Sequence, residues 1–270
     1  MLVHNMMVPF TLAHGAAALP FRRLNLVPSG LLVGTFAPDF EYFLRLAPDD
    51  SFGHTLLGTF VLTLPLALFV LWLFHTFVKL PLARLLPEVI QRRLINHVKE
   101  FRFHGMARFS LIVVSILLGI ATHLAWDSFT HSNTWLYHHW HVLGRTLNVP
   151  TLGLVPFYKV LQHGSTIIGI SILSIWLVVR YRTSTPSCQM LRGAVSSTRK
   201  VVVFTVVAIV ALMGGTIRAV AKVGIPSSRL SNNRFVGLLI VTATALAWWE
   251  LVVYGVFSSR STPAPGSPES

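Results

Sequence analysis

Residues 109–133 read FSLIVVSILLGIATHLAWDSFTHSN, and this stretch decides the fold class. Its first part, residues 109–126, contains no Asp, Glu, Lys or Arg and is long enough to enter a lipid bilayer as a helix. Its end carries His123, Asp127 and His131 at intervals of four residues. Residues four apart are neighbours on the surface of a helix. The stretch therefore predicts a membrane-spanning helix that ends in a group of ligand-type side chains.

Four further apolar segments predict the rest of the membrane domain. A helix needs about 20 apolar residues to cross the hydrocarbon core of a bilayer, and the segments approach or exceed that length. The third segment is short, and its helix is expected to begin earlier, near Phe157. Five spanning helices are therefore predicted, at residues 56–78, 109–126, 166–179, 201–217 and 235–257.

The composition also indicates a lipid environment. The chain is 53% hydrophobic and 11% charged, whereas a soluble domain has about 25% charged residues. The formal charge of +13 comes from basic residues that lie between the apolar runs, where they can contact anionic lipid headgroups. No aromatic and basic platform and no phosphate-binding glycine loop is present in the sequence. The lipid bilayer is therefore the expected partner, and nucleic acid is not.

The fold class expected from these patterns is an all-α, polytopic integral membrane helical bundle. A single membrane domain, residues 1–257, consists of an N-terminal motif region, residues 1–55, and the bundle itself, residues 56–257. Prolines break the apolar pieces of the N-terminal region, so we expect short interfacial or re-entrant helices there. The Pro- and Ser-rich tail, residues 258–270, is expected to be disordered.

The distribution of Lys and Arg predicts the orientation. The loops after the first and third spans are rich in basic residues, whereas the loop after the second span holds only Arg145 and Lys159. Basic loops stay in the cytoplasm. We therefore expect a multi-pass protein of the cell membrane whose N-terminal region faces the extracytoplasmic side. The basic residues after the fourth span oppose this orientation: Arg218, Lys222, Arg229 and Arg234.

One consequence of the topology does not depend on orientation. The N-terminal region and the loop after the second span lie at the same membrane face, because two crossings separate them. His54 directly precedes the first span, while His123 and Asp127 lie near the far end of the second. These positions converge at one face of the bilayer. The predicted metal ligands there are His14, Asp39, His54, His123, Asp127 and His131.

Helix geometry limits how these side chains can share an ion. His123 and Asp127 are about 6 Å apart along the axis and can bind the same cation. In a straight helix His131 is about 12 Å from His123, too far for a shared ion. Two alternatives remain open. Either the helix ends in the turn-forming sequence THSNT and His131 folds back, or His131 serves a second ion.

A divalent metal is the expected cofactor. A carboxylate at membrane depth costs on the order of 3 kcal/mol, and a bound cation offsets that cost. The only cysteine, Cys188, lies in a polar linker, so the ligands have to be His and carboxylate. Such a ligand set favours zinc, with manganese or iron as alternatives.

An ion with an open coordination position lowers the pKa of a bound water to about 7, which predicts metal-dependent hydrolysis. Asp39, Glu41 and Asp127 are the candidates for a catalytic general base. Gln162 and His163 are second candidates, as outer contacts of the ligands or as contacts of a substrate. Taken singly, each residue also has an ordinary interpretation, such as packing or helix capping.

Several motifs together resemble a known family. They are VPFTLAHGAAALPFRR, LVPSGLLVGTFAPDFEYFL, HTLLGTF, GIATHLAWDSFTH and YKVLQHGSTIIG. They resemble the bacterial membrane family catalogued as domain of unknown function 4184. More remotely, the pattern is similar to the membrane-bound metal-dependent hydrolase family. That resemblance implies His14, Asp39, His123 and Asp127 as ligands, with His54 and His131 in support. The chain departs from the hydrolase pattern in carrying His131 and in having Asp-Phe-Glu where a second Asp is usual.

Three functions are compatible with the sequence. The first is a metal-dependent hydrolase that acts on a lipid or phosphoester substrate at the membrane surface. The second is a non-catalytic scaffold or binding protein with a structural His/Asp cluster. The third is a metal or proton transporter. Transport is disfavoured because the ionisable residues gather at one face and do not form a chain across the bilayer.

Overall fold

The computed structural model describes residues 11–48, 52–95, 97–98, 101–150, 153–189, 191, 193 and 195–260. Five helical stretches in these residues are long and apolar enough to cross a membrane. The predicted number of spans and the all-α class are therefore confirmed, and the third span does begin at Phe157. The chain is a polytopic bundle, with spans at Leu56–Leu85, Met106–His139, Phe157–Thr183, Ser197–Val223 and Leu230–Ser258.

The first span is assembled from five consecutive pieces. They are α3 (Leu56–Gly58), η3 (Thr59–Thr63), α4 (Leu64–Leu73), η4 (Phe74–Val78) and α5 (Lys79–Leu85), and both η pieces are π-helical. The first π-helical piece ends just before Pro65, whose ring removes one backbone hydrogen bond from a regular helix. A short helix, α6 (Glu88–Leu94), follows the span.

The second span contains α7 (Met106–Thr130), which organises the core. Its buried face repeats every three or four residues, as a helix packed on one side requires. The apolar part of that face, Ile112, Ile116 and Ile120, packs against Val27 and against residues of α4. The same face continues without interruption into His123 and Asp127. His123 and Asp127 therefore extend a buried surface and do not lie on the outside of the bundle.

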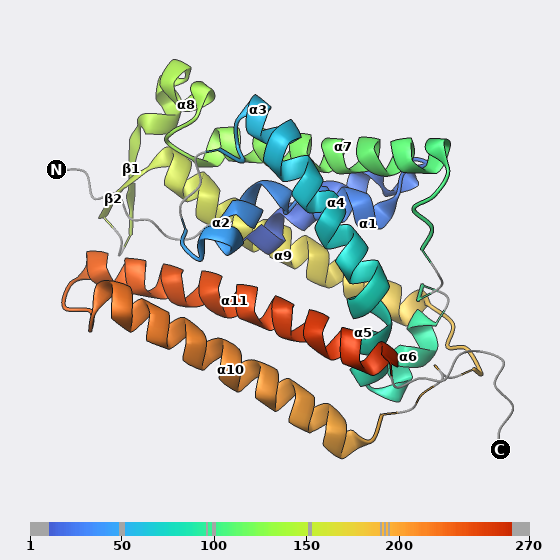
Figure 1. Cartoon of the computed structure of the whole chain (residues 1–270). Helices are drawn as coiled ribbons and strands as arrows, with labels where there is room; N and C mark the ends of the chain where they lie inside the picture. The colour runs from blue at the N-terminus through green and yellow to red at the C-terminus, as the bar shows by residue number, and fades with distance from the viewer. Residues whose placement is uncertain are drawn as a thin grey trace, which may run out of the picture.

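The N-terminal region forms short helices, as predicted, and these pack against the spans. They are η1 (Thr11–Arg23), α1 (Pro28–Gly34), η2 (Ala37–Asp39) and α2 (Phe40–Arg45). α1 lies along α7 (Figure 1), and glycines allow the two backbones to approach closely. A Cβ atom at Gly34 would collide with the carbonyl oxygen of Ile116, and one at Gly119 with that of Leu31. Residues 1–10 of the predicted motif region lie outside the described residues.

The last two spans form a long antiparallel pair. Figure 1 shows α10 (Ser197–Val223) and α11 (Arg229–Arg260) side by side along one flank of the molecule. Their contact also uses a small residue, since a Cβ at Gly215 would lie 2.8 Å from the carbonyl oxygen of Leu239. α11 runs to Arg260, so it includes the first residues of the predicted tail. Residues 261–270 of that tail lie outside the described residues.

Between α7 and the third span lies a small structure that we did not predict. It contains α8 (Trp135–His139), which ends the second span, followed by η5 (His141–Gly144) and an antiparallel pair of strands, β1 (Thr146–Val149) and β2 (Gly153–Pro156). Thr146 pairs with Pro156 and Val149 with Gly153. The chain then enters α9 (Phe157–Thr183), the third span, which returns past η1 and α7.

Candidate metal centre

The site begins with one turn of α7. His123 and Asp127 are four residues apart on the buried face, and His123 Nε2 lies 3.0 Å from Asp127 Oδ2. The other ring nitrogen, His123 Nδ1, is 2.8 Å from the carbonyl oxygen of Thr35 at the end of α1. A carbonyl oxygen can only accept a hydrogen bond, so Nδ1 carries the proton. Nε2 is thereby left as a lone-pair donor directed into the site.

Asp39 enters from the junction of η2 and α2. It is 1% exposed, and its Oδ2 accepts a 2.6 Å hydrogen bond from the hydroxyl of Thr11. Its other oxygen, Oδ1, lies 3.6 Å from His123 Nε2 and accepts no hydrogen bond among the described residues. The Thr11 contact thus orients the carboxylate with one oxygen toward α7.

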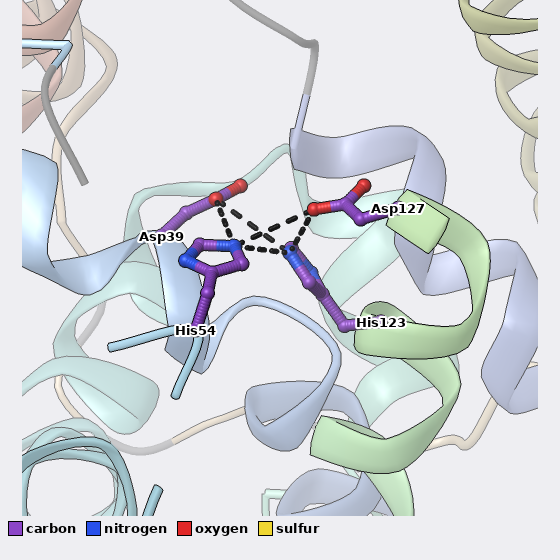
Figure 2. Close-up of side chains that lie close together, drawn as sticks. All are labelled: Asp39, His54, His123 and Asp127. Carbon is purple, nitrogen blue, oxygen red and sulfur yellow. Dashed lines mark hydrogen bonds and ion pairs between the residues drawn. The ribbon is translucent and has the colours of Figure 1, made fainter. Parts of the chain in front are cut away.

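His54 completes the group from the turn that precedes the first span. Its Nε2 lies 3.3 Å from His123 Nε2, 3.4 Å from Asp127 Oδ2 and 3.7 Å from Asp39 Oδ1. Figure 2 shows the four side chains pointing toward a common centre from three separate segments. One ligand atom from each residue lies within 4.8 Å of all the others.

These separations fit a shared cation. Metal–ligand bonds of about 2.1 Å in a tetrahedral arrangement place neighbouring ligand atoms about 3.4 Å apart. The ligand-atom distances given above run from 3.0 to 3.7 Å. Imidazole and carboxylate ligands also match the donor set that zinc, manganese and iron accept. The residues present therefore fit a divalent metal ion.

The electrostatics of the site favour a cation as well. Burial, with a smaller contribution from Asp127, raises the pKa of Asp39, against the opposing effect of His123 and of the Thr11 hydrogen bond. Burial, and then His123, lowers the pKa of His14 to about 3, so this imidazole is neutral. Among the described residues, the ion-pair partners of Asp39 and Asp127 are imidazoles. A divalent cation would neutralise the two buried carboxylates.

His14 and His131 approach the opposite side of Asp127. His14 Nε2 lies 3.5 Å and His131 Nδ1 lies 3.4 Å from Asp127 Oδ1. α7 ends at Thr130, and His131 has an extended backbone with φ −124° and ψ 146°. The helix stops before His131, as one of the two alternatives requires, but the imidazole contacts Asp127 Oδ1 without joining the four-residue group, so the alternative of a second ion stays open. All six predicted ligands thus meet, although His14 and His131 lie outside the four-residue group.

Glu41, a predicted general base, makes a different set of contacts. Its carboxylate accepts hydrogen bonds from the backbone N–H groups of Gly53, at 2.8 Å, and Phe52, at 3.2 Å, and pairs with Arg45 at 2.6 Å. Burial raises the pKa of Glu41, but the Gly53 and Arg45 hydrogen bonds outweigh this effect and lower it overall. Glu41 therefore holds the turn that carries His54.

The two second candidates differ in position. The Gln162 side chain is buried, with Nε2 3.4 Å from His131 Nε2, so it contacts the site from α9. His163 is exposed on the same helix. Gln162 and His163 are adjacent in sequence, and consecutive residues of a helix point in directions about 100° apart.

Three contacts of the site were not predicted from the sequence. Thr11 precedes His14 by three residues, and that spacing in a helical segment was a usable signal. Trp126 packs its ring 5.7 Å from that of His14 and donates a hydrogen bond to Ser165. The Thr35 contact uses a backbone carbonyl, which no residue type identifies.

Comparison with known proteins identifies the family. The family model described as a domain of unknown function (DUF4184) matches residues 7–256, which is most of the chain. Neither the curated proteins nor the solved structures gave a significant match. The chain, with its buried His/Asp cluster and five spans, therefore belongs to the DUF4184 family.

Proposed function

We propose that this protein is a metal-dependent hydrolase that acts on a lipid or phosphoester substrate at the membrane surface, with zinc as its cation and manganese or iron as alternatives. The observation that carries the proposal is the convergence of Asp39, His54, His123 and Asp127, whose ligand atoms lie within 4.8 Å of one another. Carboxylates buried this deeply inside an apolar bundle are typical of functional sites.

The bound cation would supply Lewis-acid activation of a water molecule. The protein residues would hold and orient the reactants. The His54 side chain is 21% exposed, whereas the side chains of His123 and Asp39 are 0% and 1% exposed. The His54 side of the cluster is therefore the route by which water and substrate would enter. A carboxylate oxygen of Asp39 or Asp127 that does not bind the cation would accept the proton of the water.

One further observation supports the setting of this activity. The positive-inside distribution of Lys and Arg favours an extracytoplasmic site in the cell membrane. Headgroups of lipids, or soluble phosphoesters beside the membrane, would then be the accessible substrates.

One observation favours a non-catalytic alternative. His14, His123 and Asp39 are each at most 3% exposed, so much of the cluster has no solvent contact. A structural cation that ties η1, η2 and α7 together would have this character. A transporter is less well supported, because the cluster lies at the end of α7 and not along the length of the spans.

The test starts with metal content. Wild-type protein purified in detergent, and the variants His123→Ala and Asp127→Ala, are measured by elemental analysis. His75→Ala is the matched control, because this half-buried imidazole lies further along the first span and contacts Ser29 instead of the site. We expect stoichiometric metal in the wild type and the control and its loss in both site variants. Wild-type protein without metal would overturn the proposal.

Hydrolysis is tested on a panel of chromogenic phosphomonoesters, phosphodiesters and carboxylic esters, with and without added Zn²⁺. We expect turnover that follows the metal content of the four proteins. Stoichiometric metal without turnover of any substrate class would favour the structural alternative.

A further inference from the structure

The carboxylate of Asp127 faces two separate groups of imidazoles. Its Oδ2 lies 3.0 Å from His123 Nε2 and 3.4 Å from His54 Nε2. Its Oδ1 lies 3.5 Å from His14 Nε2 and 3.4 Å from His131 Nδ1. Oδ1 is buried and accepts no hydrogen bond of regular geometry among the described residues. One cation on the Oδ2 side would leave this second arrangement without an explanation.

Building on the proposed function, we infer that Asp127 bridges two cations, the second one held by His14 and His131, and that the substrate is a phosphoester. The two distances to Oδ1 match the spacing of about 3.4 Å between neighbouring ligands of a tetrahedral ion. The second position is more open than the first, because His14 and His131 do not belong to the group whose ligand atoms all lie within 4.8 Å of one another. It contributes fewer protein ligands, which leaves coordination positions for water and substrate.

The stacking of His14 on His123 sets the distance between the two positions. The ring centroids are 4.1 Å apart, with an angle of 24° between the ring planes. Each ring directs its Nε2 toward a different oxygen of the same carboxylate. Cations bound by two parallel rings are separated by about the distance between the rings. This separation agrees with the roughly 3.5–4 Å found in two-metal hydrolytic sites.

Gln162 provides an independent indication of the second site. Its amide oxygen is buried and accepts no hydrogen bond among the described residues, while its amide nitrogen lies 3.4 Å from His131 Nε2. The two ends of an amide are interchangeable in assignment. If His131 Nδ1 binds a cation, its Nε2 carries the proton and donates it to the amide oxygen. Such an outer hydrogen bond is the usual support of a metal-binding imidazole.

The charge of a two-cation site selects the substrate class. Two divalent cations against the carboxylates of Asp39 and Asp127 leave a net positive charge, which suits an anionic phosphoester better than a neutral carboxylic ester. Hydrolysis adds one water across the P–O bond. The water oxygen bonds to phosphorus, the bond from phosphorus to the alcohol oxygen breaks, and the alcohol oxygen takes a proton that the water releases.

The test compares wild-type protein with His131→Ala after removal of metal, reconstitution with excess Zn²⁺ and desalting. His131 is preferred to His14 because it lies at the end of α7 and its side chain is 24% exposed, so the fold tolerates its loss. His75→Ala is again the control, because its imidazole contacts Ser29 and not the site. We expect two zinc ions per chain in the wild type and the control, and one in His131→Ala. Thermal unfolding in detergent confirms that all three proteins are folded.

The outcomes separate the two proposals. One zinc in both wild type and His131→Ala would overturn the second cation and leave the proposed function standing. No zinc in the wild type would overturn both. With Mn²⁺, we expect an exchange-coupled electron paramagnetic resonance signal in the wild type and an isolated-ion signal in His131→Ala. Isolated-ion signals in both proteins would again exclude a bridged pair.

Substrate class is read with bis(p-nitrophenyl) phosphate and p-nitrophenyl butyrate. We expect the phosphodiester to be the better substrate and its kcat to fall at least 10-fold in His131→Ala, with no fall in His75→Ala. Preference for the carboxylic ester would overturn the substrate assignment.

Discussion

This protein contains two helix pairs, α1 with α7 and α10 with α11, in which glycine allows the two helices of the pair to pack closely. The close contact has a different consequence in each pair. α1 packs on α7 through Gly34 and Gly119, and the contact brings the Thr35 carbonyl to within 2.8 Å of His123 Nδ1. α10 packs on α11 through Gly215, and the buried residues of α10 are Ala211, Gly215 and Ala219. The same kind of close packing positions a candidate metal ligand in the first pair and only joins two helices in the second.

Close packing of two helices is one way to build a polar site into an apolar bundle. Small residues lower the distance between helix backbones, so a backbone carbonyl of one helix can reach a side chain of the next. In α1 and α7 this contact fixes the tautomer of His123. Substitutions at the two glycine contacts should therefore affect metal binding and stability differently.

The largest effect is expected from Gly119→Ala. The new Cβ would collide with the Leu31 carbonyl oxygen and with Gly34, so α1 has to move away from α7. Overpacking of this kind costs about 1–3 kcal/mol, and it also withdraws Thr35 from His123. We expect a lower unfolding temperature in detergent together with loss of most bound metal by elemental analysis. Wild-type metal content in this variant would show that the α1 contact does not position the site.

Gly215→Ala is the counterpart in the other helix pair. Its Cβ would lie 2.8 Å from the Leu239 carbonyl oxygen, which predicts a destabilisation of about 1 kcal/mol. We expect the unfolding temperature to fall while metal content stays at the wild-type value. A parallel loss of metal would remove the distinction between the two pairs.

Thr11→Val tests the contribution of a single hydrogen bond inside the site. The substitution keeps the shape of the side chain but removes the hydroxyl that donates to Asp39 Oδ2 at 2.6 Å. Loss of such an outer contact typically weakens metal binding about 10–100-fold. Competition with a zinc chelator measures the affinity. Thr166→Val, which removes a hydroxyl that donates to the Gln162 backbone carbonyl, is expected to leave the affinity unchanged.

The smallest effect on metal content is expected from Glu41→Gln. The amide cannot reproduce all the contacts of the carboxylate with Gly53, Phe52 and Arg45, so the turn before the first span should be destabilised by about 1 kcal/mol. We expect bound metal and a modest fall in unfolding temperature. A variant with full metal and full stability but no hydrolytic activity would instead support the sequence-based interpretation of Glu41 as a general base.

Much of the fold could be predicted because lipid imposes simple rules. The spans follow from apolar runs of sufficient length, and the start of the third span near Phe157 was also confirmed. The paired strands β1 and β2 were missed, since short exposed strands carry little periodicity. The tight packing of α1 against α7 depends on Gly34 and Gly119, which are 85 positions apart in sequence. A contact between residues so far apart cannot be predicted from a local sequence pattern.

The order of residues was enough to predict that His123 and Asp127 share a helix face, because helical geometry relates residues four apart, and that residues of the N-terminal region lie close to them. Which side chain contacts which atom of the site became clear only from the tertiary structure. In the folded chain the two oxygens of Asp127 lie near different imidazoles, and the Thr35 carbonyl orients the ring of His123. Glu41 accepts a hydrogen bond from Gly53 and so stabilises the turn that carries His54. These choices depend on contacts between segments far apart in the chain, whose distances follow from packing and not from residue order.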